Sequence, residues 1–94
     1  MKVTNQTSDQ DQVKICLYSP EDKVDWIPVG AGVFVVQRND TVPWHPPGNE
    51  GLPAYYLKAF HPAFFDQNLA NASVGVNDSV AVRGGNGSYT IVPL

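Results

Sequence analysis

The residues in this chain that could bind a metal ion are few and widely spaced. It has one cysteine, Cys16, and two histidines, His45 and His61. None of them forms the C-x₂-C or H-x₃-H spacing that is typical of zinc sites. A blue-copper site would need two histidines, a cysteine and usually an axial methionine, but the single methionine is Met1 and Cys16 precedes both histidines. We therefore expect no cofactor. Calcium stays open, with ligands from Asp22 and Asp25 or from Asn77 and Asp78, although neither pair forms an EF-hand loop.

Catalytic patterns are also missing from the sequence. No G-x-S-x-G motif or Cys/His arrangement supplies a nucleophile with an adjacent base. Glu50 and Asp66 could be imagined as a carboxylate pair, but nothing in their spacing supports it. The glycine-rich segment 84–87 is not followed by a helix or a Lys-Ser/Thr pair, so it predicts a hairpin turn instead of a phosphate-binding loop. We expect that the protein is not an enzyme.

Aromatic side chains and both histidines gather in one short part of the chain. They are Trp44, His45, Tyr55, Tyr56, Phe60, His61, Phe64 and Phe65. Most of these rings are expected in the core, because aromatic residues dominate burial in small β domains. Trp44 differs, since it opens a Pro/Gly-rich loop over residues 44–53 in which burial is difficult. The predicted ligand-binding residues are Trp44, His45, Asn49, Glu50, Tyr56 and His61.

An exposed ring beside short polar side chains suits stacking on a sugar or anchoring a protein partner. We therefore expect a non-enzymatic recognition module, and first a small carbohydrate-binding, lectin-like protein that uses this loop. Two alternatives stay open. One is a structural subunit that forms a homo-oligomer, and the other is a defence protein, a toxin component or inhibitor, that binds a protein or membrane partner. A net charge of −3 with dispersed basic residues argues against a nucleic-acid partner.

The elements that must position these residues are short strands. Val13, Ile15 and Leu17 alternate with more polar positions, as do Tyr55, Leu57 and Ala59, and turn residues separate such runs along the whole chain. This spacing predicts six to eight short strands in an all-β fold, a small antiparallel β-sandwich or a small barrel. The sequence does not give the strand order.

The segment 32–37 (GVFVVQ) has apolar residues at consecutive positions, which predicts a central strand covered on both faces. Residues 1–11 lack any periodicity and are predicted to be a flexible tail. Residues 12–94 then form a single domain, in keeping with a chain of 94 residues.

The chain carries no visible signal peptide or membrane-spanning run. Met1 to Gln12 has no apolar core, and about 18 consecutive apolar residues occur nowhere, so we expect a cytoplasmic protein without a transmembrane segment. Secretion from a processed precursor stays open. Cys16 is alone, so no intramolecular disulfide can form, and we expect it to be buried in a strand. Five Asn-x-Ser/Thr triplets are interpreted as turn chemistry, with glycosylation left open; they begin at Asn5, Asn39, Asn71, Asn77 and Asn86.

Overall fold

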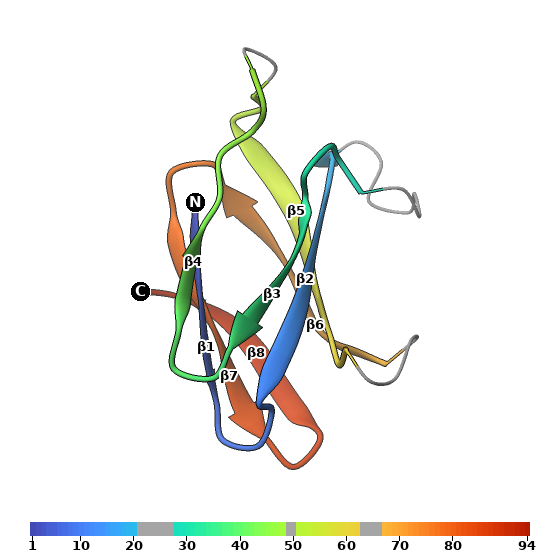
Figure 1. Ribbon diagram of the computed structural model, residues 1–94, viewed down its shortest axis with the longest axis vertical. Helices are drawn as coiled ribbons and strands as arrows, with labels where there is room; N and C mark the ends of the chain where they lie inside the picture. The colour runs from blue at the N-terminus through green and yellow to red at the C-terminus, as the bar shows by residue number, and fades with distance from the viewer. Residues whose placement is uncertain (21–27, 49–50, 63–66) are drawn as a thin grey trace.

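The computed structural model of the chain describes residues 1–20, 28–48, 51–62 and 67–94. These residues form eight strands and no helix (Figure 1). The strands are β1 (Lys2–Thr7), β2 (Gln12–Tyr18), β3 (Val33–Gln37), β4 (Thr41–Pro43), β5 (Ala54–Phe60), β6 (Asn68–Gly75), β7 (Ser79–Gly85) and β8 (Ser88–Pro93). Within the described residues no helix is long and apolar enough to cross a membrane.

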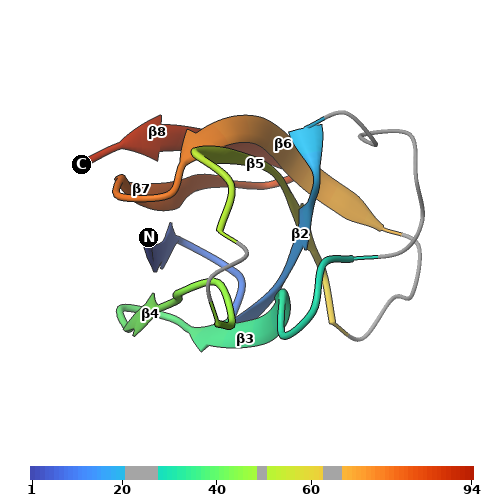
Figure 2. The same cartoon turned by 90° about the horizontal axis from the view of Figure 1, so that it is seen from above.

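The strands build two four-stranded sheets that pack face to face, so the predicted all-β sandwich is confirmed. One sheet has the order β4-β1-β7-β8 and the other β3-β2-β5-β6. Strands β3 and β4 lie together at one side of the sandwich, and β6 lies beside β8 at the other (Figure 2). One pair differs from the antiparallel expectation, because β1 runs parallel to β7. These two strands come from distant parts of the chain, so no tight turn between them imposes an antiparallel direction.

The prediction of a flexible tail over residues 1–11 is wrong. Residues 2–7 form β1, which lies between β4 and β7 in its sheet (Figure 1). Val3 and Asn5 are completely buried, and Thr7 is almost so. A strand with one buried valine among polar residues has no apolar alternation to detect. Its polar side chains are buried because they bond to each other and to the backbone, which removes the cost of leaving water.

Alternation elsewhere correctly identified the core. Val13, Ile15 and Leu17 of β2 are fully buried between the sheets, opposite inward-facing residues of β5. Each fully buried aliphatic side chain of this kind contributes about 1.5–3 kcal/mol. Cys16 points to the other face of its sheet and is buried as expected. Burial disfavours the thiolate, which raises the pKa of its thiol.

The prediction for the segment 32–37 is correct in type and wrong in place. Residues 33–37 form β3, but β3 is an edge strand of its sheet. Val36 is buried and Phe34 partly buried against the core, whereas Val33 and Val35 face outward with 48% and 42% of their surface exposed. A run of consecutive apolar residues indicates that both faces of the strand are hydrophobic. It does not record whether another element covers the second face.

The turn interpretation holds for three of the five Asn-x-Ser/Thr asparagines. Asn86 and Gly87 connect β7 to β8 with φ values of 55° and 84°, as a two-residue hairpin turn requires. Asn39 also has a positive φ of 68°, and Asn77 lies in the turn after β6. Asn71 lies within β6 and Asn5 within β1, so for these two the interpretation is wrong.

Candidate functional site

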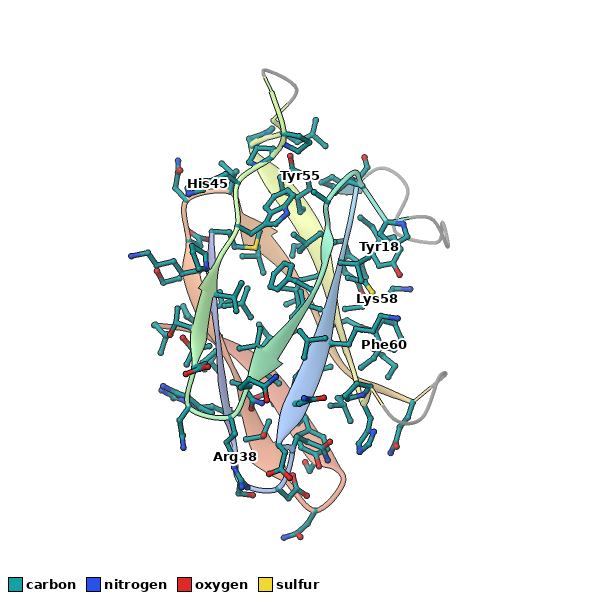
Figure 3. The ribbon with its side chains drawn as sticks, viewed as in Figure 1. Tyr18, Arg38, His45, Tyr55, Lys58 and Phe60 are labelled. Atoms are coloured by element: carbon teal, nitrogen blue, oxygen red, sulfur yellow. The ribbon has the colours of Figure 1, made fainter. Side chains whose placement is uncertain are left out.

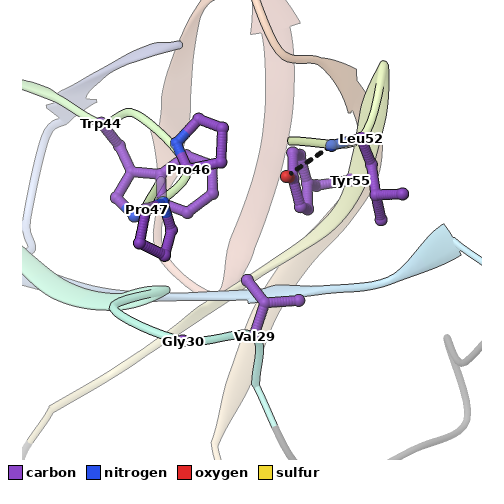
Figure 4. A pocket seen from close by; sticks show the side chains of 7 residues that line it. All are labelled: Val29, Gly30, Trp44, Pro46, Pro47, Leu52 and Tyr55. Atoms are coloured by element: carbon purple, nitrogen blue, oxygen red, sulfur yellow. Dashed lines mark hydrogen bonds between the residues drawn. The ribbon is translucent and has the colours of Figure 1, made fainter. Parts of the chain in front are cut away.

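A pocket of about 280 Å³ lies where β4 leaves the sandwich and β5 enters it (Figure 4). It is lined by Val29, Gly30, Trp44, Pro46, Pro47, Leu52 and Tyr55. The two prolines have fixed φ angles and lack N–H groups, so this part of the chain cannot join a ladder and stands away from the sheets. The result is a hollow walled by side-chain rings at the end of a rigid sandwich.

Trp44 forms one wall of the pocket and belongs to the core. Its side chain is 6% exposed, and its ring meets that of Tyr55 edge to face, with 5.0 Å between centroids and an interplanar angle of 84°. The indole Nε1–H donates to the carbonyl oxygen of Ala31 at 2.8 Å. The expectation that the Pro/Gly-rich loop would keep this ring out of the core is therefore wrong. A hydrogen bond to the β2–β3 connection satisfies the indole N–H, which makes burial possible.

Tyr55 forms a second wall and carries a hydroxyl group. The residue is 2% exposed, and its hydroxyl oxygen accepts a hydrogen bond from the backbone N–H of Leu52 at 2.9 Å (Figure 4). A phenol that accepts in this way still has its own proton to donate. Leu52 is 37% exposed beside it. The pocket thus combines apolar ring faces with a fixed hydroxyl.

The opposite side of the pocket comes from the segment before β3. The backbone N–H of Val29 donates to the carbonyl oxygen of Leu17 at 2.8 Å, which ties this segment to the end of β2. At Gly30 the pocket is lined by backbone. A Cβ atom added there would lie 3.9 Å from Cγ of Pro47, an ordinary contact distance, and Gly30 has no positive φ. A Cβ atom at position 30 is therefore accommodated next to a residue that lines the pocket.

The structure separates the residues that the sequence predicted as one site. Trp44 lines this pocket, whereas His45 lines another hollow beside Met1 and Asp78, and His61 lines a third one beside Asp9 and Gln37. Figure 3 shows how far apart the ends of the sandwich are, with His45 toward one end and Arg38 toward the other. Tyr56 pairs with Tyr18 on the outer face of its sheet, and Asn49 and Glu50 lie outside the described residues.

The sequence prediction missed Tyr55, Leu52, Val29 and Gly30 as pocket residues. For Tyr55 a signal existed, because alternation along β5 turns its ring inward toward Trp44. Val29 and Gly30 reach the pocket through the packing of a loop that is 14 residues or more distant from Trp44 in the chain. No local pattern records such a contact.

The hollow beside His61 is larger, about 400 Å³, and polar, but its acidic groups are already bonded. The carboxylate of Asp9 accepts from the Asn86 backbone N–H at 2.9 Å and from the Tyr89 hydroxyl at 2.8 Å. These two hydrogen bonds, the backbone one first, lower the pKa of Asp9. Asp11 forms an ion pair with Arg38 at 2.8 Å.

Within the part of the chain that the structure describes, no three His, Cys, Asp or Glu side chains gather closely enough to hold a metal ion. The ring-walled pocket is the better candidate site, because four side-chain rings and a fixed hydroxyl line one space, whereas the acidic groups of the hollow beside His61 are already bonded. No family model, no curated protein and no solved structure matches this chain.

Proposed function

We propose that this chain is a non-enzymatic recognition module of lectin type, and that the pocket between Trp44 and Tyr55 holds one ring of a neutral sugar. The observation that carries the proposal is the set of flat surfaces around the opening. The aromatic rings of Trp44 and Tyr55 and the pyrrolidine rings of Pro46 and Pro47 line a shared space. A pyranose ring presents a face of C–H groups that packs on such surfaces, and its hydroxyl rim needs hydrogen-bond partners.

The size of the pocket supports a one-ring ligand. Its volume of about 280 Å³ lies just below the range of roughly 300–1,000 Å³ in which drug-sized molecules bind. The Tyr55 hydroxyl is held by the Leu52 N–H at 2.9 Å, so it can meet a sugar hydroxyl without first losing conformational freedom.

The chemistry of the lining supports a neutral ligand. None of the seven lining residues carries a charge. None of these described lining residues could pair with the charge of an acidic or amino sugar, and burying an unpaired charge is costly. We therefore expect neutral hexoses to bind and charged analogues of the same size to bind more weakly.

Titration of neutral and charged monosaccharides, followed by backbone NMR shifts, tests the proposal. We expect shifts at Gly30 and Leu52 with the neutral sugars. Gly30→Leu adds a side chain to a residue that lines the pocket, and we expect it to weaken binding at least tenfold. Leu52→Ala should weaken it less, while Leu94→Ala, a matched change at a leucine that is 58% exposed elsewhere, should leave it unchanged. Binding that survives Gly30→Leu would place the sugar site elsewhere and refute the proposal.

A further inference from the structure

Among the residues that the structure describes, strand β3 has a ladder partner on one edge only. Hydrogen bonds at both ends of the β2–β3 ladder show which residues of β3 direct their backbone groups toward β2. The Leu17 N–H donates to the Gly32 carbonyl at 2.8 Å, and the Arg38 N–H donates to the Asp11 carbonyl at 2.9 Å. Backbone groups alternate in direction along an antiparallel strand. Phe34 and Val36 therefore bond to β2, and Val33 and Val35 direct their N–H and C=O groups away from it.

This edge lacks the devices that usually protect a sheet edge, such as charged residues, prolines and bulges. Strand β3 reads VFVVQ. Strand β4 has three residues and ends in Pro43, and β6 and β8 lie against each other. Among the described strands, β3 pairs with β2 and with no other. Its Val33 and Val35 side chains are exposed on the outer face of the sheet.

We propose that two copies of this chain associate by pairing their β3 strands antiparallel, with the two-fold axis at Phe34. In this register Val33 lies opposite Val35 of the second copy, and the two residues exchange both of their free N–H and C=O groups. The symmetric pair does the same, so four hydrogen bonds use every backbone group that Val33 and Val35 direct outward. An axis at Val35 would instead require the Gln37 carbonyl, which already accepts from the Asp40 N–H at 3.0 Å.

Side chains favour the same arrangement. Val33 and Val35 point to one face of the sheet and are 48% and 42% exposed. Pairing two β3 strands brings four valines together across the axis, and such β-branched cross-strand pairs stabilise sheets. On the neighbouring strand β2, the charged residue Lys14 lies opposite Val35. The Lys14 residues of the two copies would be three strand spacings apart, about 14 Å, which exceeds the Debye length of about 8 Å at physiological ionic strength.

The outward N–H and C=O groups of Val33 and Val35 match the same groups of a second β3 strand in antiparallel orientation. We therefore expect the partner on this edge to be a second copy of the chain. The contact is small. A single strand pair falls below the roughly 1,000 Å² of buried surface that a stable interface needs, so we expect weak and concentration-dependent association. The inference does not depend on the sugar pocket, which no β3 residue lines.

Analytical ultracentrifugation over a range of concentrations, combined with residue-resolved hydrogen exchange, tests the pairing. We expect the mass to rise from 10.2 kDa toward twice that value, with the amides of Val33 and Val35 becoming protected in the same concentration range. Val35→Lys places a charge on the edge and should weaken association at least tenfold. Asn71→Lys adds the same charge to an exposed position on β6 and should not.

Three results would overturn the proposal. The chain stays monomeric at about millimolar concentration, or it associates while the Val33 and Val35 amides remain unprotected, or Val35→Lys and Asn71→Lys change association equally. A circular dichroism spectrum identical to that of the unmodified chain shows that each lysine variant is folded.

Discussion

The two ends of the sandwich are closed in different ways. At the end we call the Trp44 end, comprising Trp44, Tyr55 and the pocket, two aromatic rings pack edge to face with 5.0 Å between their centroids. At the opposite end, the Asn5 end, Asn5 is completely buried and joined by hydrogen bonds to Thr7 and two backbone carbonyls. The Trp44 end is stabilised by the packing of buried aromatic rings, whereas the Asn5 end is stabilised by hydrogen bonds between buried polar groups.

Asn5 uses all of its side-chain capacity. Its Nδ2 donates to the carbonyls of Gln10 and Val36 at 3.1 and 3.2 Å, and its Oδ1 accepts from the N–H and hydroxyl of Thr7 at 3.1 and 2.7 Å. These bonds connect β1, the turn after it, and β3. A network that is fully satisfied has nothing left for a ligand. At the Trp44 end, bulky rings cannot fill the corner completely, and a pocket remains. A hollow lies at each end, and the two differ in their lining, which is made of rings at the Trp44 end and of polar side chains at the Asn5 end.

Removing the ring of Trp44 should have the largest effect on this comparison. We expect Trp44→Ala to lower the free energy of unfolding by about 3–5 kcal/mol, as for other buried tryptophans. Urea denaturation measures the change. Trp44→Phe keeps a ring against Tyr55 and loses the bond from Nε1 to Ala31, so it should cost less. A loss below about 1 kcal/mol for Trp44→Ala would show that the ring does not belong to the core.

Removing the amide of Asn5 should have the next largest effect. Asn5→Ala removes four hydrogen bonds and leaves the buried Thr7 backbone N–H without its acceptor, so we expect a loss of about 2–4 kcal/mol. Asn71→Ala, at an exposed asparagine in β6, should stay within about 0.5 kcal/mol. If both variants unfold at the same urea concentration, hydrogen bonding does not hold the Asn5 end.

Removing the Tyr55 hydroxyl separates the contribution of its hydrogen bond from that of its ring at the Trp44 end. Tyr55→Phe keeps the ring contact and deletes the acceptor for the Leu52 N–H, so we expect a loss of about 1 kcal/mol in stability. Sugar binding should fall more steeply than stability if the hydroxyl meets the ligand. Unfolding and titration of the same variant separate the two effects. Unchanged binding would remove Tyr55 from the recognition site.

The pH dependence at the Asn5 end should be the smallest effect. The backbone N–H of Asn86 and the Tyr89 hydroxyl lower the pKa of Asp9 in the folded chain. A lowered folded pKa adds stability above the unfolded pKa, and this stability is lost as the pH falls through the folded value, below about pH 4. Asp9→Asn should therefore flatten the decline of the melting temperature at acidic pH. Asp40→Asn, an exposed carboxylate in the turn before β4, serves as the control. Parallel acid profiles for Asp9→Asn and the unmodified chain would contradict this.

Local sequence patterns were sufficient to predict part of this structure. Alternation in β2 and β5 revealed the core, and the glycine-rich segment 84–87 revealed a hairpin, because each depends on residues close together in the chain. Pattern failed for β1, where Asn5 and Thr7 are buried by partners that the sequence does not place beside them. It failed for β3 as well, since covering a strand is a property of its neighbours. The four predicted binding residues that the structure describes, Trp44, His45, Tyr56 and His61, lie in different hollows or on the outer face of a sheet for the same reason, because no local signal states which loops meet.

By itself the sequence determined that the segments of β2, β3 and β5 form strands, that a hairpin turn joins β7 to β8, which side chains of β2 and β5 face inward, and the lack of an intramolecular disulfide. These properties come from backbone preferences and from the period of two along a strand. Tertiary structure decided that β1 pairs in parallel with β7, that β3 lies at an edge and that Trp44 is buried with Tyr55 beside a pocket. Each of these joins residues far apart in the chain, and their free energy comes from contacts that exist only once the two sheets have packed.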